Sequence, residues 1–157
     1  MVLKIEEWEF EVDPERTAAH AAEALAGHCT CGYCENYYRC APVIYPALPG
    51  FLKQFSLELE APSEMYPFEP TLYLLGYRVY GRILRYGHGP MMVCGAVPVM
   101  PRPVDDECFM LEVGELRLSW VLPEDPEEVL SPANEPEFLD RMYRVMLRRG
   151  DFTGLPS

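Results

Sequence analysis

The chain reads EWEFEVDPERTAAHAAEALAG from residue 7 to residue 27, and this stretch determines the class of fold. In its first part, acidic and apolar residues alternate strictly, which places Trp8, Phe10 and Val12 on one side of the backbone. A period of two residues is typical of a β-strand that buries one face. Residues 7–13 are therefore predicted to form a half-buried strand.

A helix is predicted directly after this strand. Asp13 is suited to cap the free N–H groups of a first helical turn, and Pro14 is favoured at the first helical position. The alanine-rich residues 15–26 have high helix propensity, and Gly27 indicates where the helix ends. The next segment, which is rich in cysteine, is thus expected to begin where this helix ends.

Most of the remaining elements are predicted to be strands. The strand-like segments are Thr71–Leu75, Tyr77–Tyr86, Met91–Met100 and a hairpin of Cys108–Val113 and Glu115–Leu122 around Gly114. Short helical turns are predicted at Cys34–Cys40 and Tyr45–Phe55, and a last helix between Asn134 and Gly150. Consecutive strands with helices at the two ends favour an α+β fold. We expect an antiparallel sheet with helices packed on one face, a strand and helix before the cysteine-rich turn, and a C-terminal helix.

Length, charge and composition limit the function classes. A chain of 157 residues is of ordinary size for one domain, so a single domain over 1–157 is predicted. The formal net charge of −12 repels polyanions, which argues against a nucleic acid partner. No apolar run approaches the length of a membrane span, and the first residues lack the basic and apolar regions of a signal peptide. A cytoplasmic protein with reduced cysteines and no membrane partner is predicted.

Four of the six cysteines gather after the predicted helix, with a histidine beside them. Zinc prefers four sulfur or nitrogen ligands, and short spacings let one loop supply two or three of them. The spacing therefore suggests zinc, but it lacks the second spaced cysteine pair of the best-known zinc motifs. The candidate ligands are Cys29, Cys31, Cys34, Cys40 and His28, with His20 and His88 as more distant choices for a fourth position.

Two other interpretations of the same cysteines stay open. They are free thiols on a turn, some of them buried as small apolar residues. Alternatively, Cys31 and Cys34 form a redox pair, because a helix that starts near Gly32 would lower the pKa of Cys34. No thioredoxin-like βαβ pattern surrounds them.

The motifs of common enzymes are absent from the sequence. It contains no glycine-rich nucleotide loop, no nucleophile elbow and no H-E-x-x-H segment. A non-enzymatic domain that binds a protein or a small ligand is the first hypothesis. The alternative is an enzyme that uses a zinc-bound water or a Cys34 thiolate, for which a concave pocket beside the cysteines is expected.

The segment CGYCENY at residues 31–37, together with Thr17 and the segment YRVYGRI at residues 77–83, resembles an uncharacterised family of small bacterial proteins. Those chains carry a C-x-C-x-x-C-x-N-[FY] segment. The resemblance extends from Trp8 to Leu84, although residues 55–58 read FSLE where such chains often read LGID. It implies a bacterial, cytosolic setting, with the region of Cys31, Cys34 and Asn36 as a shared feature, and it implies no activity.

Overall fold

The computed structural model describes residues 1–69 and 71–123. The chain divides into two units, Met1–Val121 and Leu122–Ser157. The helix predicted between Asn134 and Gly150 lies outside the described residues, and the single domain over 1–157 stays a prediction.

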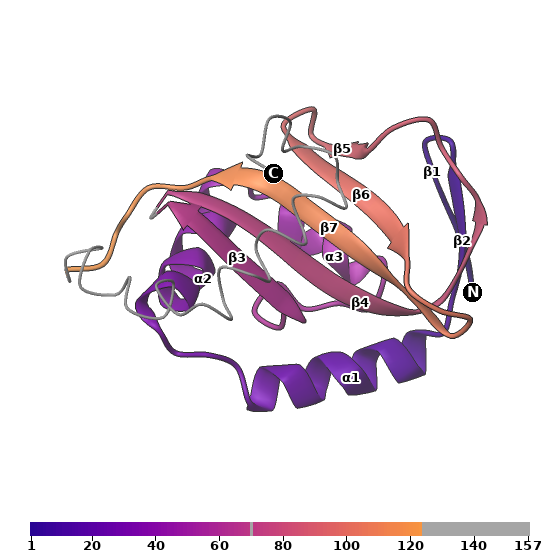
Figure 1. The fold of residues 1–157 in the computed structure, drawn as a ribbon, viewed down its shortest axis with the longest axis horizontal. Coiled ribbons are helices and arrows are strands. Elements are labelled where there is room, and N and C mark those ends of the chain that lie inside the picture. Colours follow the sequence, from indigo (N-terminus) through magenta and orange to yellow (C-terminus); the bar gives the residue numbers. More distant parts are fainter. Residues whose placement is uncertain (70, 124–157) are drawn as a thin grey trace, which may run out of the picture. The chain divides into compact units, whose positions relative to one another are not determined.

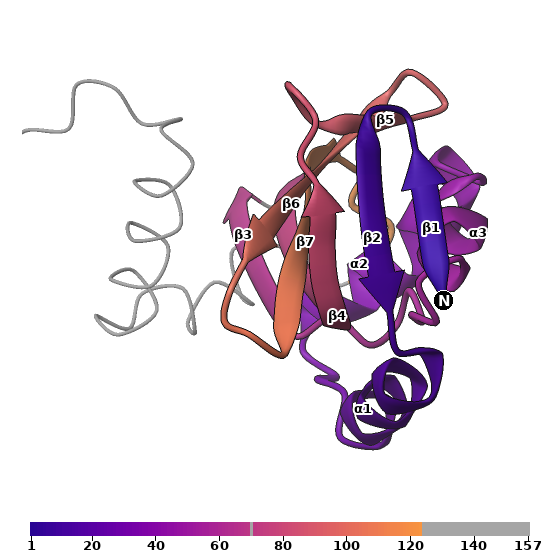
Figure 2. The same ribbon diagram turned by 90° about the vertical axis from the view of Figure 1, so that its right-hand side faces the viewer.

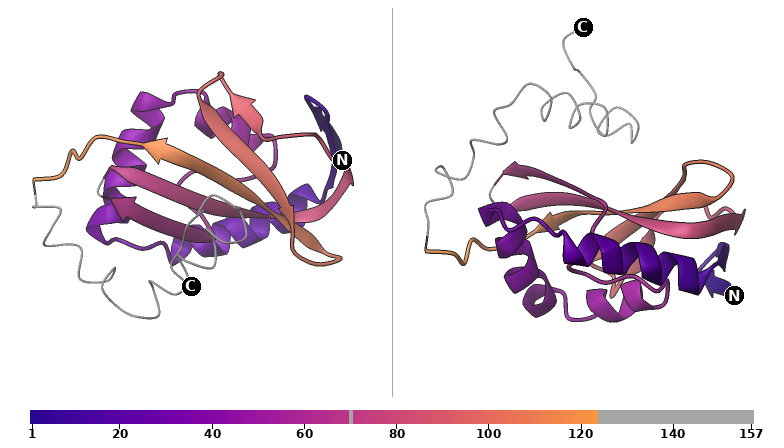
Figure 3. Two further views of the ribbon diagram at one scale, coloured as in Figure 1. Left: turned by 45° about the horizontal axis from the view of Figure 1, so that its top comes forward. Right: turned by 90° about the horizontal axis from the view of Figure 1, so that it is seen from below.

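The described residues form a mixed α+β structure. Its elements are β1 (Val2–Ile5), β2 (Trp8–Val12), α1 (Pro14–Ala26), α2 (Gly32–Ile44), α3 (Leu48–Lys53), β3 (Glu64–Glu69), β4 (Leu72–Arg85), β5 (Met91–Val93), β6 (Val97–Pro103) and β7 (Cys108–Arg117). The strands make one antiparallel sheet in the order β1-β2-β4-β7-β6-β5, with β3 also paired to β4 (Figure 1). The three helices lie on one side of this sheet (Figure 3), so the predicted α+β class is confirmed. None of these helices is long and apolar enough to cross a membrane.

The long strand β4 organises the sheet. One edge of β4 pairs with β7. Along the other edge, the first residues of β4 pair with β3 and its last residues pair with β2. Between β3 and β2, two side-chain hydroxyls replace a neighbouring strand: the N–H of Tyr80 donates to Thr17 Oγ1 at 3.0 Å and that of Arg78 to Ser63 Oγ at 3.2 Å. Because Thr17 belongs to α1, this contact holds α1 at the sheet edge, below β2 and β4 in Figure 2.

The predicted N-terminal strand and helix are confirmed. In β2, the side chains of Trp8, Phe10 and Val12 are buried and alternate with more exposed acids. In α1, the Asp13 carboxylate accepts the N–H of Arg16 at 3.0 Å, as expected for an N-cap. The ring of Phe10 lies 5.2 Å from that of Phe109 in the sheet, so the strand docks directly into the apolar core.

The hairpin predicted around Gly114 is wrong, because β7 runs without a turn from Cys108 to Arg117. Gly114 instead lies where the register between β7 and β4 shifts, next to Tyr73 and Leu74. A Cβ atom there would lie 2.8 Å from the Tyr73 carbonyl oxygen, and the φ of +132° is one that side chains disfavour. The glycine thus marks a close backbone approach inside a strand, which a sequence pattern does not distinguish from a turn.

Two further predictions of strand boundaries need correction. Met91–Met100 is not one buried strand, since β5 and β6 form a hairpin whose turn contains Cys94 and Gly95 at positive φ. The segments on either side of Gly76 are one strand, β4. The short strands β1 and β3 were not predicted, since β1 has four residues and β3 contains Pro67, which is unfavourable in a strand.

Candidate metal centre

The connection between α1 and α2 brings three cysteines together. Cys29 lies in this connection, Cys31 is the residue before α2, and Cys34 lies in the first turn of α2. Residues three apart at the start of a helix share one face, so Cys31 and Cys34 are neighbours. The chain approaches that face from the end of α1, which carries Cys29 to the same place.

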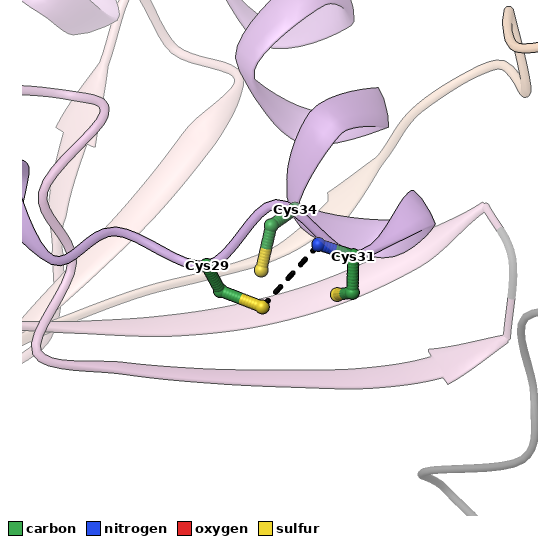
Figure 4. A group of neighbouring side chains, drawn as sticks. All are labelled: Cys29, Cys31 and Cys34. Carbon is green, nitrogen blue, oxygen red and sulfur yellow. Dashed lines mark hydrogen bonds between the residues drawn. The ribbon is translucent and has the colours of Figure 1, made fainter.

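The three sulfur atoms converge. Their Sγ atoms all lie within 4.8 Å of one another, and Figure 4 shows the side chains pointing toward a common point. Thiolates about 2.3 Å from a tetrahedral ion lie about 3.8 Å apart, so small side-chain rotations complete a site. The backbone N–H of Cys31 also donates to Cys29 Sγ at 3.4 Å, which holds the Cys29 side chain against the start of α2. Cys29, Cys31 and Cys34 are therefore placed to hold a metal ion.

The three thiols differ in exposure and acidity. Cys29 is exposed, Cys31 half-buried and Cys34 buried. A hydrogen bond from the Cys34 thiol lowers the pKa of Cys31, and the same bond together with burial raises the pKa of Cys34. The prediction that the helix start lowers the pKa of Cys34 is thus wrong, because Cys34 is the donor in this pair. The more acidic thiol is Cys31, which is the more accessible of the two.

Two aromatic side chains hold the connection in place. The hydroxyl of Tyr38, on α2, donates to the carbonyl of Cys29 at 3.2 Å. His28 Nδ1 lies 2.7 Å from the carbonyl oxygen of Leu25 in the last turn of α1, so this nitrogen carries the proton. The His28 ring also meets the Tyr38 ring edge-on at 5.3 Å between centroids. These contacts fix the backbone that carries Cys29.

The other predicted ligands lie apart from this cluster. Within the described residues, the group of ligand atoms that includes the three sulfurs contains no fourth member of the cysteine, histidine or carboxylate type. Cys40 is buried further along α2, and His28 is bonded to α1 as described. His20 lies against the Tyr80 ring and His88 pairs with Glu7. Of the five residues predicted as ligands, the structure brings together Cys29, Cys31 and Cys34.

A fourth sulfur atom lies beside the cluster. Met65, half-buried on β3, places its Sδ 3.6 Å from Cys34 Sγ. The two residues are 31 positions apart, and only the fold brings β3 against the start of α2. A methionine in a strand is ordinarily an apolar core residue, so no signal in the sequence distinguishes Met65 as part of a site.

Asn36, which follows Cys34 by two residues, has a positioning role. Its buried side-chain amide donates to Tyr73 Oη at 3.2 Å and to the Ser119 carbonyl at 2.9 Å, and its oxygen accepts the N–H of Val121 at 2.8 Å. The bonds fasten the start of α2 to β4 and to the segment after β7.

The chain was compared with known protein families, with curated proteins and with solved structures, and no match was found in any of the three comparisons. The resemblance to small bacterial proteins accordingly stays a prediction. The function must be argued from the geometry of the cluster itself.

Proposed function

We propose that this protein is a metal-dependent binding module in which Cys29, Cys31 and Cys34 hold one thiophilic metal ion. The observation that carries this proposal is the convergence of the three Sγ atoms within 4.8 Å. Thiolates are ligands for zinc and for other soft ions, and zinc is the ion that the sequence pattern suggests. The proposal assumes the cytoplasmic, reducing setting that keeps thiols available.

The ion would act on the junction of α1 and α2. This junction contributes Cys29 and carries little regular structure between Ala26 and Gly32. A metal bond to Cys29 and to the first turn of α2 fastens the connection to α2, and an ion that binds only the folded chain stabilises the fold. The exposure of Cys29 gives the ion a path from solvent.

A binding role is favoured over the enzymatic alternative by the low acidity of the Cys34 thiol. Two clefts, of about 510 and 370 Å³, lie near the ends of β2 and β4, and their linings include Glu11, Arg82 and Phe109. Neither lining includes a residue of the cysteine cluster. The pKa of Cys34 is raised, which argues against the Cys34 thiolate as a nucleophile. The partner we propose is a protein or small ligand, with the nucleic acids disfavoured by charge.

Metal analysis combined with thiol titration tests the proposal. The protein is purified anaerobically without added metal, and its thiols are titrated with and without a strong chelator. We expect close to one equivalent of metal, three thiols that react only after chelation, and loss of the metal in a variant with Cys29, Cys31 and Cys34 all changed to Ser.

Cys94→Ser is the matched control, because Cys94 is exposed and lies in the β5–β6 turn, outside the cluster. This variant should keep its metal. Less than about a tenth of an equivalent, with every accessible thiol titrating freely, would refute the proposal.

A further inference from the structure

The contact between Cys34 and Met65 joins the cysteine cluster to the sheet. Cys34 Sγ and Met65 Sδ lie 3.6 Å apart. This contact is a hydrogen bond from the Cys34 thiol to the Met65 thioether. Two sulfur ligands of one tetrahedral ion with metal–sulfur bonds of about 2.3 Å lie about 3.8 Å apart, so the same two atoms are close enough to share an ion once the ion replaces the Cys34 proton. Met65 approaches from β3, whereas the three cysteines come from the connection and α2.

We propose that the thioether of Met65 is the fourth ligand and that the completed site selects Cu(I). This inference rests on the proposed metal-binding function and names the ion that the site prefers. The donor set becomes three thiolates and one thioether, all of them sulfur. No described histidine or carboxylate belongs to the cluster and offers zinc a nitrogen or oxygen ligand in this fourth position.

The choice of ion follows from the softness of the donors. Thiolate and thioether ligands together favour Cu(I), a soft monovalent ion. The ligands that zinc takes in proteins are thiolates, imidazoles and carboxylates, and a neutral thioether is a poor substitute for them. Zinc would therefore use the three thiolates alone, while Cu(I) gains a further bond from Met65. The side chain of Met65 thus determines selectivity between two ions that share the same three thiolates.

The ligands are also graded in exposure, which suits an ion that must enter and leave. Cys34 is buried and Met65 half-buried, whereas Cys29 faces solvent. An incoming ion meets the exposed Cys29 first and the buried Cys34 last.

Competition for Cu(I) against the chelator bicinchoninate tests the inference. Reduced protein is titrated anaerobically, and zinc affinity is measured in parallel with a zinc-sensitive dye. We expect Met65→Leu to weaken Cu(I) binding by about tenfold or more and to change zinc binding by less than about twofold. Met100→Leu is the matched control, because Met100 lies on β6 and is 40% exposed, and it should change neither affinity.

A second readout does not depend on how well the variant folds. In wild-type protein labelled at its methionine methyl groups, Cu(I) should shift the Met65 methyl resonance strongly, and zinc should not. Both ions are diamagnetic, so the two spectra can be compared directly.

Two results would overturn the inference while leaving the metal site standing. One is equal Cu(I) affinity in wild type and Met65→Leu together with an unshifted methyl resonance. The other is an equal loss of zinc and Cu(I) affinity in Met65→Leu. If the wild type binds neither ion, the proposed function itself fails along with this inference.

Discussion

The Asn36 side chain makes three hydrogen bonds, all to segments far away in sequence. The hydrogen bonds of its side-chain amide reach Tyr73, Ser119 and Val121, and the Asn36 residue is completely buried. We expect Asn36→Ala to lower the free energy of unfolding by about 2 kcal/mol, because buried partners lose their hydrogen bonds. Urea denaturation followed by circular dichroism measures the change.

Arg39→Ala, on the exposed side of the same helix, is the control and should change the free energy of unfolding by less than about 0.5 kcal/mol. Equal stability of Asn36→Ala and the wild type would contradict the positioning role of Asn36.

A buried chain of hydroxyls connects α2 to the sheet. Tyr77 donates to the Leu59 carbonyl at 2.6 Å, so Tyr37, 2.6 Å from Tyr77, donates to Tyr77. Burial raises the pKa of both tyrosines. Above the ordinary tyrosine pKa of about 10, the unfolded chain releases protons that the native chain keeps, so the free energy of unfolding falls as pH rises.

Tyr77→Phe tests this hydroxyl chain. At pH 7 it should cost about 1–3 kcal/mol, since the Leu59 carbonyl and the Tyr37 hydroxyl lose their partner. Between pH 9.5 and 11 its stability should fall less steeply than that of the wild type, because one titrating group is gone. Tyr86→Phe, at a site 56% exposed, is the control at pH 7 and should change the free energy of unfolding by less than about 0.5 kcal/mol. Identical slopes for Tyr77→Phe and the wild type would rule out this origin of the pH dependence.

The sequence predicts single residues of the candidate site only where the ligands are neighbours along the chain. Cys29, Cys31 and Cys34 could be recognised because spacings of two and three residues by themselves keep side chains close. Met65 and Asn36 could not, because their partners are set by the packing of α2 on the sheet. The sequence also led to the wrong prediction that Cys34 has the lowered pKa. The pKa of Cys31 is lowered instead, because Cys34 donates the hydrogen bond between the two sulfur atoms.

At the scale of elements, the edge of β4 depends on Thr17. Within residues 1–69 and 71–123, no strand covers the N–H of Tyr80, which donates to Thr17 Oγ1 at 3.0 Å instead. We expect Thr17→Val to cost about 1–3 kcal/mol, because the substitution keeps the shape of the side chain but leaves this N–H without an acceptor. Hydrogen exchange of the Tyr80 amide should become faster in the same variant.

Thr17→Ser keeps the hydroxyl and serves as the matched variant. It should protect the Tyr80 amide nearly as well as the wild type does. Slow exchange of this amide in Thr17→Val would show that the hydroxyl does not close the sheet edge.

Strands and helices with a clear period of apolar residues or a clear helix cap could be predicted from the sequence. Features that depend on a close approach between two backbone segments, or on an unusual backbone conformation, could not. The alternation in β2 and the cap and alanines of α1 specify these elements locally. Gly114 was interpreted as a turn, although it accommodates a neighbouring carbonyl within a strand. The turn at Cys94 and Gly95 was missed because cysteine is unusual at positive φ.

At the scale of the whole molecule, metal binding and folding should be coupled. The ligand cluster is assembled only when α1, α2 and β3 are in place, so an ion that binds the native chain better than the unfolded chain stabilises it. Free metal at a hundred times its dissociation constant should add about 2.7 kcal/mol to the free energy of unfolding. Thermal melts of the wild type with and without metal, in a reducing buffer, measure the shift.

The variant with all three cluster cysteines changed to Ser provides the comparison for these melts. Its melting temperature should not respond to the metal. A similar response in both proteins would mean that the ion acts elsewhere on the molecule.

Anomalous diffraction from crystals of the metal-loaded protein, recorded at the absorption edge of the bound metal, tests the metal centre most directly. The account predicts one strong anomalous peak about 2.3 Å from the Sγ atoms of Cys29, Cys31 and Cys34. A peak at any other place, or three unliganded sulfur atoms in protein saturated with metal, would contradict it.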